Sequence, residues 1–133
     1  MKVAAMMRAD VRTIPANATV ADAAAMLVET GLSALPVIDP VRGPVGVATC
    51  HDILRAAFGA GSGRRRVRSR ERAPVTDAMS PWPPSVAPDA DVDEAARLML
   101  YLDVKRVFVV ENGSLVGVVS QTDITDAVAT AKL

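Results

Sequence analysis

The stretches GVATCHDI (residues 46–53) and GVVSQTDI (residues 117–124) share one pattern and decide the fold. In each, a run of Gly, Val and other small residues suits a buried strand, and the sequence after the aspartate has helical apolar spacing. A hydroxyl residue and an aspartate stand three apart at the junction, as Thr49 and Asp52 or as Ser120 and Asp123. The simplest role of this spacing is a capping box, in which hydroxyl and carboxylate each accept a backbone amide. Each stretch therefore predicts a strand that leads directly into a capped helix.

These stretches belong to a longer internal repeat. A shift of 72 residues places VAAMM (3–7) on VTDAM (75–79) and SALPVID (33–39) on KRVFVVE (105–111). After a one-residue deletion in the following turn, a shift of 71 aligns the two junction stretches. A repeat of this kind indicates that one structural unit is used twice. The predicted division is repeat 1 at 1–60, an Arg-rich connector at 61–73, and repeat 2 at 74–133.

Each repeat predicts the order β-α-β-β-α and hence an α+β fold. Prolines at positions 15, 83, 84 and 88 exclude helix around Thr13-Ile14 and Ser85-Val86, so the chain is expected to be extended there. The two strands of each following hairpin are expected to join at Arg42-Gly43 and Asn112-Gly113.

The helix ends also have sequence signals. Thr19 and Asp91 are the predicted caps of the first helices, with Asp22 and Glu94 three residues on to complete capping boxes. Gly31 is expected to end the first helix. The second helices are expected to begin near Asp52 and Asp123, and the last of them to run to the C-terminus.

The composition limits the classes of protein to consider. Half of the residues are apolar, aromatic residues make up 3%, and the formal net charge is zero. Cys50 is the single cysteine, so no intramolecular disulfide is expected. No secretory signal is recognisable, and no apolar run approaches the ~20 residues that span a bilayer. We therefore expect a cytoplasmic protein that does not enter a membrane.

The basic residues are unevenly distributed. GRRRVRSRER (63–72) holds six arginines against Glu71 alone, which leaves nine basic and fourteen acidic residues elsewhere. This stretch is either a solvated connector or an anion clamp for phosphates or an acidic partner. Nucleic-acid binding would depend on this run alone, without the interleaved aromatic residues of strand binders, so we do not expect a nucleic-acid partner.

The ordered motifs resemble those of the CBS domain family, in particular a tandem pair called a Bateman module. The resemblance rests on VTDAM, on ALPVID, and on the two junction stretches, and it covers almost the whole chain. It implies two repeats packed as a pseudo-twofold intramolecular pair, with adenosine-containing ligands in two clefts between them. It also implies a homodimer formed through the helices.

A strand-to-helix junction offers a second role for the hydroxyl and the aspartate. Helix amides and a hydroxyl can donate to phosphate, whereas an ionised carboxylate only accepts and so suits the hydroxyls of a ribose. The spacing thus matches a nucleoside phosphate as well as a cap. In the family the equivalent residues have these ligand-binding roles, which the resemblance assigns to Thr49, Asp52, Ser120 and Asp123.

The resemblance also implies which residues surround the adenine and the phosphates. Phe108 stands where repeat 1 has Pro36, and it either narrows the second cleft or fills core. Arg106 is a candidate phosphate ligand, and His51 is either another or a solvated loop residue. Beside the four junction residues, the predicted nucleotide-binding set is Thr13, Ile14, Pro15, Ala34, Leu35, Pro36, His51, Ser85, Val86, Arg106, Val107 and Thr122.

The sequence therefore predicts a regulatory module that senses AMP, ADP or ATP, with S-adenosylmethionine or NAD(H) as further candidates. It is expected to need no cofactor or metal and to act on a regulated protein partner. The alternatives are a structural dimerisation module with unoccupied clefts and nucleic-acid binding through the connector. No Ser-His-Asp order, Cys-His pair or metal cluster suggests an enzyme.

Overall fold

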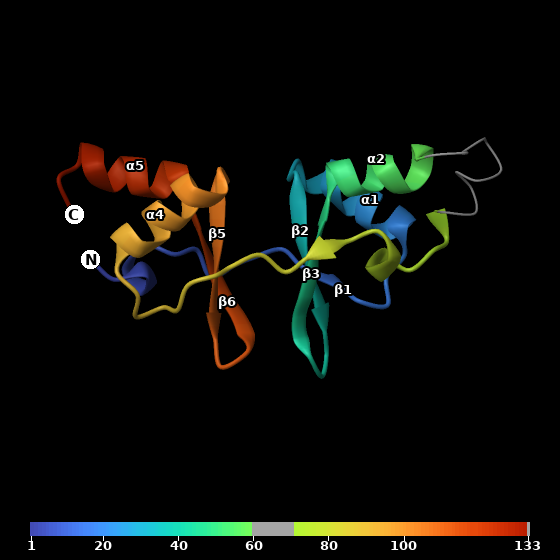
Figure 1. The fold of residues 1–133 in the computed structure, drawn as a ribbon, viewed down its shortest axis with the longest axis horizontal. Helices are drawn as coiled ribbons and strands as arrows, with labels where there is room; N and C mark the ends of the chain where they lie inside the picture. Colours follow the sequence, from blue (N-terminus) through green and yellow to red (C-terminus); the bar gives the residue numbers. More distant parts are fainter. Residues whose placement is uncertain (60–70, 133) are drawn as a thin grey trace. The chain divides into compact units, whose positions relative to one another are not determined.

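The structure is a computed structural model that describes residues 1–59 and 71–132. It confirms the predicted α+β class, and the helices follow the expected order (Figure 1). The strand that opens repeat 2 lies at Ser80–Pro81, whereas the predicted Ser85-Val86 stretch forms only a single bridge. The elements are β1 (Ile14–Pro15), α1 (Val20–Thr30), β2 (Ala34–Asp39), β3 (Gly43–Thr49), α2 (Cys50–Phe58), β4 (Ser80–Pro81), α4 (Val92–Leu102), β5 (Arg106–Glu111), β6 (Ser114–Ser120) and α5 (Gln121–Ala129). Short 3-10 helices at Val3–Ala5 and Val75–Asp77 open the two repeats.

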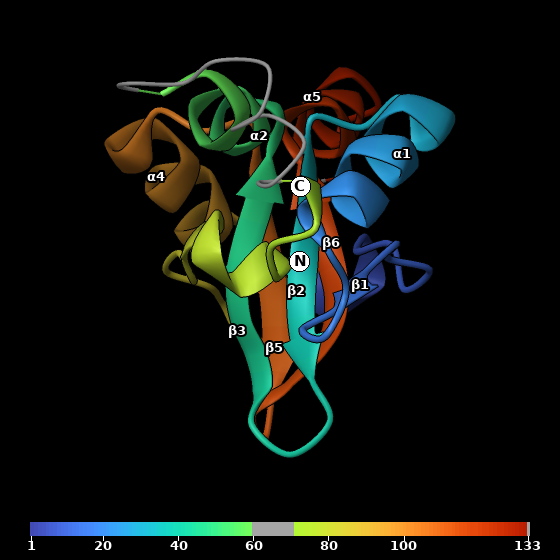
Figure 2. The ribbon, with the colours of Figure 1, turned by 90° about the vertical axis from the view of Figure 1, so that its right-hand side faces the viewer.

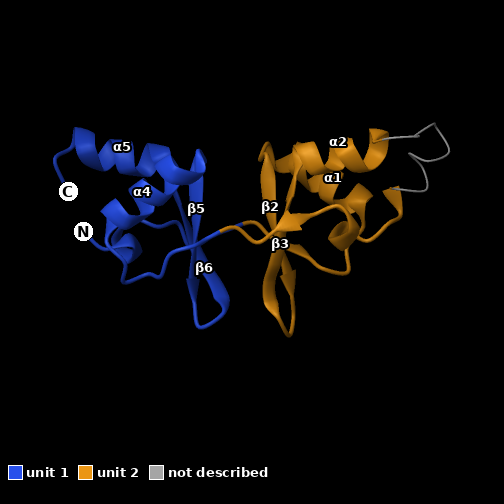
Figure 3. Cartoon of the chain, in the orientation of Figure 1, with its two compact units in different colours: residues 1–11, 84–133 blue, residues 12–83 orange. Residues whose placement is uncertain are grey.

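The chain folds into two compact units that exchange the opening segments of the repeats (Figure 3). Unit 1 consists of Met1–Val11 with Pro84–Leu133, and unit 2 consists of Arg12–Pro83. Val3 is buried in the core of unit 1, and its repeat equivalent Val75 is buried in the core of unit 2. The compact units are therefore a different division of the chain from the predicted repeats at 1–60 and 74–133.

Unit 2 is built on a four-stranded sheet in the order β1-β2-β3-β4. β1 is parallel to β2, with Ile14 opposite Val37, and the other pairs are antiparallel. Helices α1 and α2 cover one face of this sheet (Figures 1 and 2). The core is formed by Ile14, Ala18, Ala23, Leu27, Leu35, Val37, Ala48 and Val75.

Unit 1 follows the same plan around the β5-β6 hairpin, which α4 and α5 cover on one face (Figure 1). The predicted hairpin turn is confirmed, with Asn112 and Gly113 at φ 51° and 77°, as a tight two-residue turn requires. Single bridges from Val86 to Val109 and from Arg8 to Val118 take the positions that β1 and β4 have in unit 2. The core is formed by Val3, Val86, Ala95, Met99, Val107, Val109 and Val119.

Glycines on β3 and β6 let the exchanged segments lie close to the sheets. A Cβ added to Gly46 would lie 2.7 Å from the Ser80 carbonyl oxygen, and one added to Gly117 would lie 2.7 Å from the Met7 sulfur. Any larger residue would therefore push the exchanged segment away from its strand.

Most of the predicted helix ends are confirmed. Thr19, Thr49 and Ser120 each form a complete capping box, and Gly31 ends α1 with φ 70°. The predicted box at Asp91 and Glu94 is wrong, because the Asp91 side chain makes no cap hydrogen bond. That carboxylate lies 3.2 Å from the ammonium of Lys2, a residue of the exchanged segment. The last helix also ends earlier than expected, at Ala129.

Candidate functional site

The two predicted junctions have the same local geometry. The Asp52 amide donates to Thr49 Oγ1 and the Thr49 amide donates to Asp52 Oδ2, both at 3.0 Å. At the other junction the Asp123 amide donates to Ser120 Oγ at 3.1 Å, and the Ser120 amide to Asp123 Oδ2 at 3.0 Å. The capping role is thus confirmed at both, and it occupies one carboxylate oxygen in each.

Asp52 has two further side-chain donors. Arg55 Nη2 donates to Oδ1 at 2.7 Å, and the Ser80 hydroxyl lies 2.8 Å from Oδ1 and 3.1 Å from Oδ2. The side chain is 1% exposed. Because the Ser80 hydroxyl has a single proton, these two donors and the Thr49 amide fill three of the roughly four acceptor sites of the carboxylate. The two hydroxyls of a ribose would have to displace at least one of them.

Asp123 is more loosely held. Among the described residues, the hydrogen-bond contacts of its Oδ1 are with Nε and Nη2 of Arg8, both at 3.4 Å, and its side chain is 13% exposed. Partial burial opposes ionisation, but hydrogen bonds from the Ser120 amide and hydroxyl, with the Arg8 charge, outweigh it and lower the pKa of Asp123. Asp123 is therefore an ionised acceptor with one weakly engaged oxygen.

The hairpins place further predicted residues beside the junction hydroxyls. Ala34 lies opposite Thr49 in the β2-β3 pair, and Arg106 lies opposite Ser120 in the β5-β6 pair. Opposite residues in an antiparallel pair extend on the same face of the sheet. The strand register therefore places Arg106 on the same face of the hairpin as Ser120.

The remaining predicted residues differ in exposure. The apolar ones lie mostly in the two cores, and Phe108 is buried as well. Ile14, Leu35, Pro36, Val86 and Val107 are buried; Thr13, Ala34, Thr49, Ser85 and Ser120 are half-buried; Pro15, His51, Arg106 and Thr122 are exposed. Arg72 is exposed, and the other connector arginines, at 64, 65, 66, 68 and 70, lie outside the described residues.

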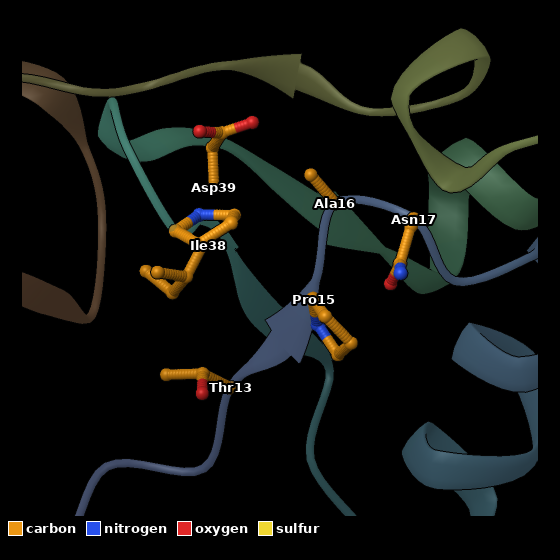
Figure 4. A pocket seen from close by; sticks show the side chains of 7 residues that line it. Thr13, Pro15, Ala16, Asn17, Ile38 and Asp39 are labelled. Carbon is orange, nitrogen blue, oxygen red and sulfur yellow. The ribbon is translucent and has the colours of Figure 1, made fainter.

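A pocket in unit 2 contains two of the predicted residues, Thr13 and Pro15 (Figure 4). Its volume is about 490 Å³, and its other lining residues are Ala16, Asn17, Ile38, Asp39 and Pro40. Asp39 pairs with Gly43 at one end of β2, whereas Ala34 pairs with Thr49 at the other. The structure therefore separates the predicted repeat 1 residues into a pocket group and a junction group.

Asp39 was not among the predicted site residues. Its Oδ1 accepts the amides of Val41 and Arg42, at 2.8 and 2.9 Å, and so holds the hairpin turn. These hydrogen bonds, that of Arg42 first, lower the pKa of Asp39. An aspartate followed by Pro40 at the end of a predicted strand is a turn signal, and that signal could have placed Asp39 at this rim.

Arg8 is the other residue that sequence reasoning missed. It lies 115 positions from Asp123 in the chain, and the exchange of opening segments brings the two together. The sequence pattern of a single repeat cannot indicate this contact, because the two residues belong to different repeats. Among the described residues, no group of three or more His, Cys, Asp or Glu could hold a metal ion.

Comparison with known proteins decides the family. The sequence model of the CBS domain matches the chain twice, at residues 3–59 and 75–130. This chain belongs to the CBS domain family. The two matches lie within the repeats seen in the sequence, and the resemblance noted there is confirmed.

Individual proteins are similar to nearly the whole of this chain. MJ1404 of Methanocaldococcus jannaschii is 33% identical over 98% of this chain, which spans about a third (32%) of that protein's length. The AcuB structure from Vibrio cholerae has a TM-score of 0.82 at 25% identity, covering 100% of this chain and 94% of that one. The structure of CBSX2 in complex with AMP has a TM-score of 0.80 at 29% identity, covering 99% and 98%.

None of the described helices has an apolar stretch long enough for a membrane span.

Proposed function

We propose that this CBS domain chain is a regulatory, non-catalytic module that binds an adenosyl ligand at its strand-to-helix junctions. The observation that carries the proposal is the hydroxyl-x-x-Asp junction, which occurs at equivalent places in both units with matching geometry. The 29% identical CBSX2 was crystallised with AMP, which supports an adenosine-containing ligand for this chain.

The junction chemistry fits the two polar parts of such a ligand. The Ser120 or Thr49 hydroxyl and the first amides of the helix donate to phosphate, and the Asp carboxylate accepts from the ribose hydroxyls. The adenine lies against backbone of the neighbouring strands, Ser85-Val86 and Val107 in unit 1 or Ile14 and Leu35 in unit 2. AMP, ADP and ATP come first among the candidate ligands, followed by S-adenosylmethionine and NAD(H).

Isothermal titration of the whole chain with AMP, ADP, ATP, S-adenosylmethionine and NADH tests the proposal. We expect saturable binding of at least one of the five, and a higher melting temperature in its presence because a ligand that binds only the folded state stabilises it. Absence of both effects with all five ligands would contradict the proposal. Once a ligand is found to bind, binding of a partner protein that depends on that ligand would establish the regulatory role.

A structural dimerisation module is the second candidate, and the burial of Asp52 among its internal donors favours it. Large apolar side chains are exposed on all four described helices of the two units: Val28, Leu54, Phe58, Leu100, Tyr101 and Val128. Leu54 and Phe58 are four residues apart and so share one face of α2. We propose that these helices pair with a second copy of the chain, whether or not a ligand is bound.

Nucleic-acid binding and the cellular location both stay predictions. Nucleic-acid binding through the connector remains an alternative that a salt-dependent mobility shift, lost on replacing the connector arginines with alanine, would support. The cytoplasmic location likewise stays a prediction.

A further inference from the structure

The two junctions differ in charge at three equivalent positions. Unit 1 has Arg8, Lys105 and Arg106, where the repeat places Ser80, Ser33 and Ala34 in unit 2. All three basic residues are exposed, whereas Ser80 and Ala34 are half-buried. The capping hydroxyl and the aspartate are retained in both units, so the difference lies in what surrounds them.

The position of Arg8 is fixed by its backbone and not by its side chain. Arg8 pairs with Val118 of β6 through two hydrogen bonds, at 2.9 and 3.0 Å, just as Ser80 pairs with Val47 of β3. A side chain at this position reaches the junction carboxylate in both units. In unit 2 a short hydroxyl donates to a carboxylate that is 1% exposed, and in unit 1 a long cation, 70% exposed, reaches a carboxylate that is 13% exposed.

The other two cations lie at the same end of the hairpin. Arg106 is directly opposite Ser120, and the Lys105 carbonyl accepts the Gln121 amide, the first of α5, at 2.9 Å. Neither side chain has an ion pair among the described residues. Like charges gathered at one edge repel one another, and an anion placed among them removes that repulsion.

The two junction helices also differ in the charge that lies one turn after the aspartate. Arg55 lies one turn after Asp52 and holds its carboxylate, but the repeat places Asp126 at the matching position of α5. Asp123 therefore has no cation on its own helix, and Arg8 is the cation that pairs with it. Because that contact is long and exposed, breaking it costs little free energy, of the order of a surface ion pair.

We propose that the unit 1 junction is the one that distinguishes phosphorylated adenosyl ligands from neutral ones, and that Arg8 is its specificity-determining residue. The inference rests on the proposed function. When the ribose hydroxyls take Asp123, the Arg8 side chain leaves that carboxylate and, together with Arg106, donates to the phosphate. Asp52 keeps its internal partners and serves as a structural carboxylate of unit 2. Exposed Asp126 is the one acidic residue that opposes the anion from α5.

The test compares the dissociation constants of AMP and adenosine for the whole chain by isothermal titration. Arg8→Ser gives unit 1 the residue that unit 2 has at this position. We expect this variant to bind AMP roughly tenfold or more weakly, since a hydrogen bond to a charged group is lost, and to bind adenosine as tightly as the unchanged chain or more tightly. Arg97→Ser is the matched control, because Arg97 is an exposed arginine of the same unit, paired with Asp93 at 3.5 Å.

Each outcome decides the matter. An unchanged AMP-to-adenosine ratio in Arg8→Ser, or an equal loss in Arg97→Ser, would overturn the role of Arg8. Loss of adenosine binding in Ser80→Ala but not in Asp123→Asn would place the site in unit 2 and overturn the assignment. Failure of the unchanged chain to bind any adenosyl ligand would remove the proposed function and this inference with it.

Discussion

The hydroxyl of Ser80 lies 2.8 Å from one carboxylate oxygen of Asp52 and 3.1 Å from the other, so a residue of the second repeat completes a buried site of the first. Removing this donor leaves a buried carboxylate short of a hydrogen bond. We expect Ser80→Ala to lower the free energy of unfolding by about 1–3 kcal/mol. Urea unfolding followed by circular dichroism measures it.

The control for that variant is Arg8→Ala, at the equivalent position of unit 1. Since the Arg8 contact with Asp123 is exposed and 3.4 Å long, its loss should cost less than about 1 kcal/mol. Equal losses in the two variants would show that burial of Asp52 does not matter.

The close approach at Gly46 gives a second prediction. At both glycines an added Cβ meets a flexible methionine side chain first, but the backbone oxygen behind it is closer at Gly46, 2.7 Å to the Ser80 carbonyl oxygen, than at Gly117, 3.1 Å to the Arg8 carbonyl oxygen. Backbone cannot move aside as a side chain can, so Gly46→Ala should destabilise by about 1–3 kcal/mol and Gly117→Ala by less. The order of the two melting temperatures tests this, and a lower melting temperature for Gly117→Ala would contradict it.

The lowered pKa of Asp123 predicts a dependence of stability on pH. The folded state holds the proton less tightly than the unfolded chain, whose value is 3.8. The stabilisation is therefore complete above that value and is lost as the pH falls through the lower, folded pKa. The difference in unfolding free energy between the unchanged chain and Asp123→Asn should shrink below pH 3.8.

Urea unfolding at neutral pH, near pH 5 and near pH 3 measures this difference. Asp39, whose pKa is also lowered, titrates in both proteins and so cancels. A difference that stays constant over the whole range would exclude a contribution from ionisation of Asp123.

The exposed helix residues predict a dimer. Light scattering with size exclusion should give about twice the chain mass of 13.9 kDa. Replacing Leu100 and Tyr101 of α4 by glutamate should shift the mass toward one chain, because burying these charges in an interface is unfavourable. Val41→Glu is the control, since Val41 is 91% exposed in the β2-β3 turn and not on a helix. The same shift in the control would argue against pairing through the helices.

Local patterns predicted the elements that depend on local chemistry. The boxes at Thr19, Thr49 and Ser120, the end of α1 at Gly31 and the turn at Asn112-Gly113 each need only residues within a few positions. The prediction failed at Asp91, whose carboxylate pairs with Lys2, because a residue distant in the chain competes with the local cap.

In the candidate site, too, the local features could be predicted and the long-range contacts could not. The hydroxyl-x-x-Asp spacing predicted which residues form the junctions, since that geometry is set within one turn of helix. The partners of the two carboxylates could not be predicted, because both repeats have the same pattern whichever opening segment packs on them. Only the fold shows that Ser80 reaches Asp52 and Arg8 reaches Asp123.

The exchange of opening segments has a consequence for synthesis on the ribosome. Residues 12–83 form one continuous unit, so that unit can be completed while the remainder is still being translated at roughly 5–20 residues per second. Val3, translated before that unit, must wait for its core neighbour Val119, more than a hundred positions later. The opening segment of repeat 1 is thus made before unit 2 but docks after it.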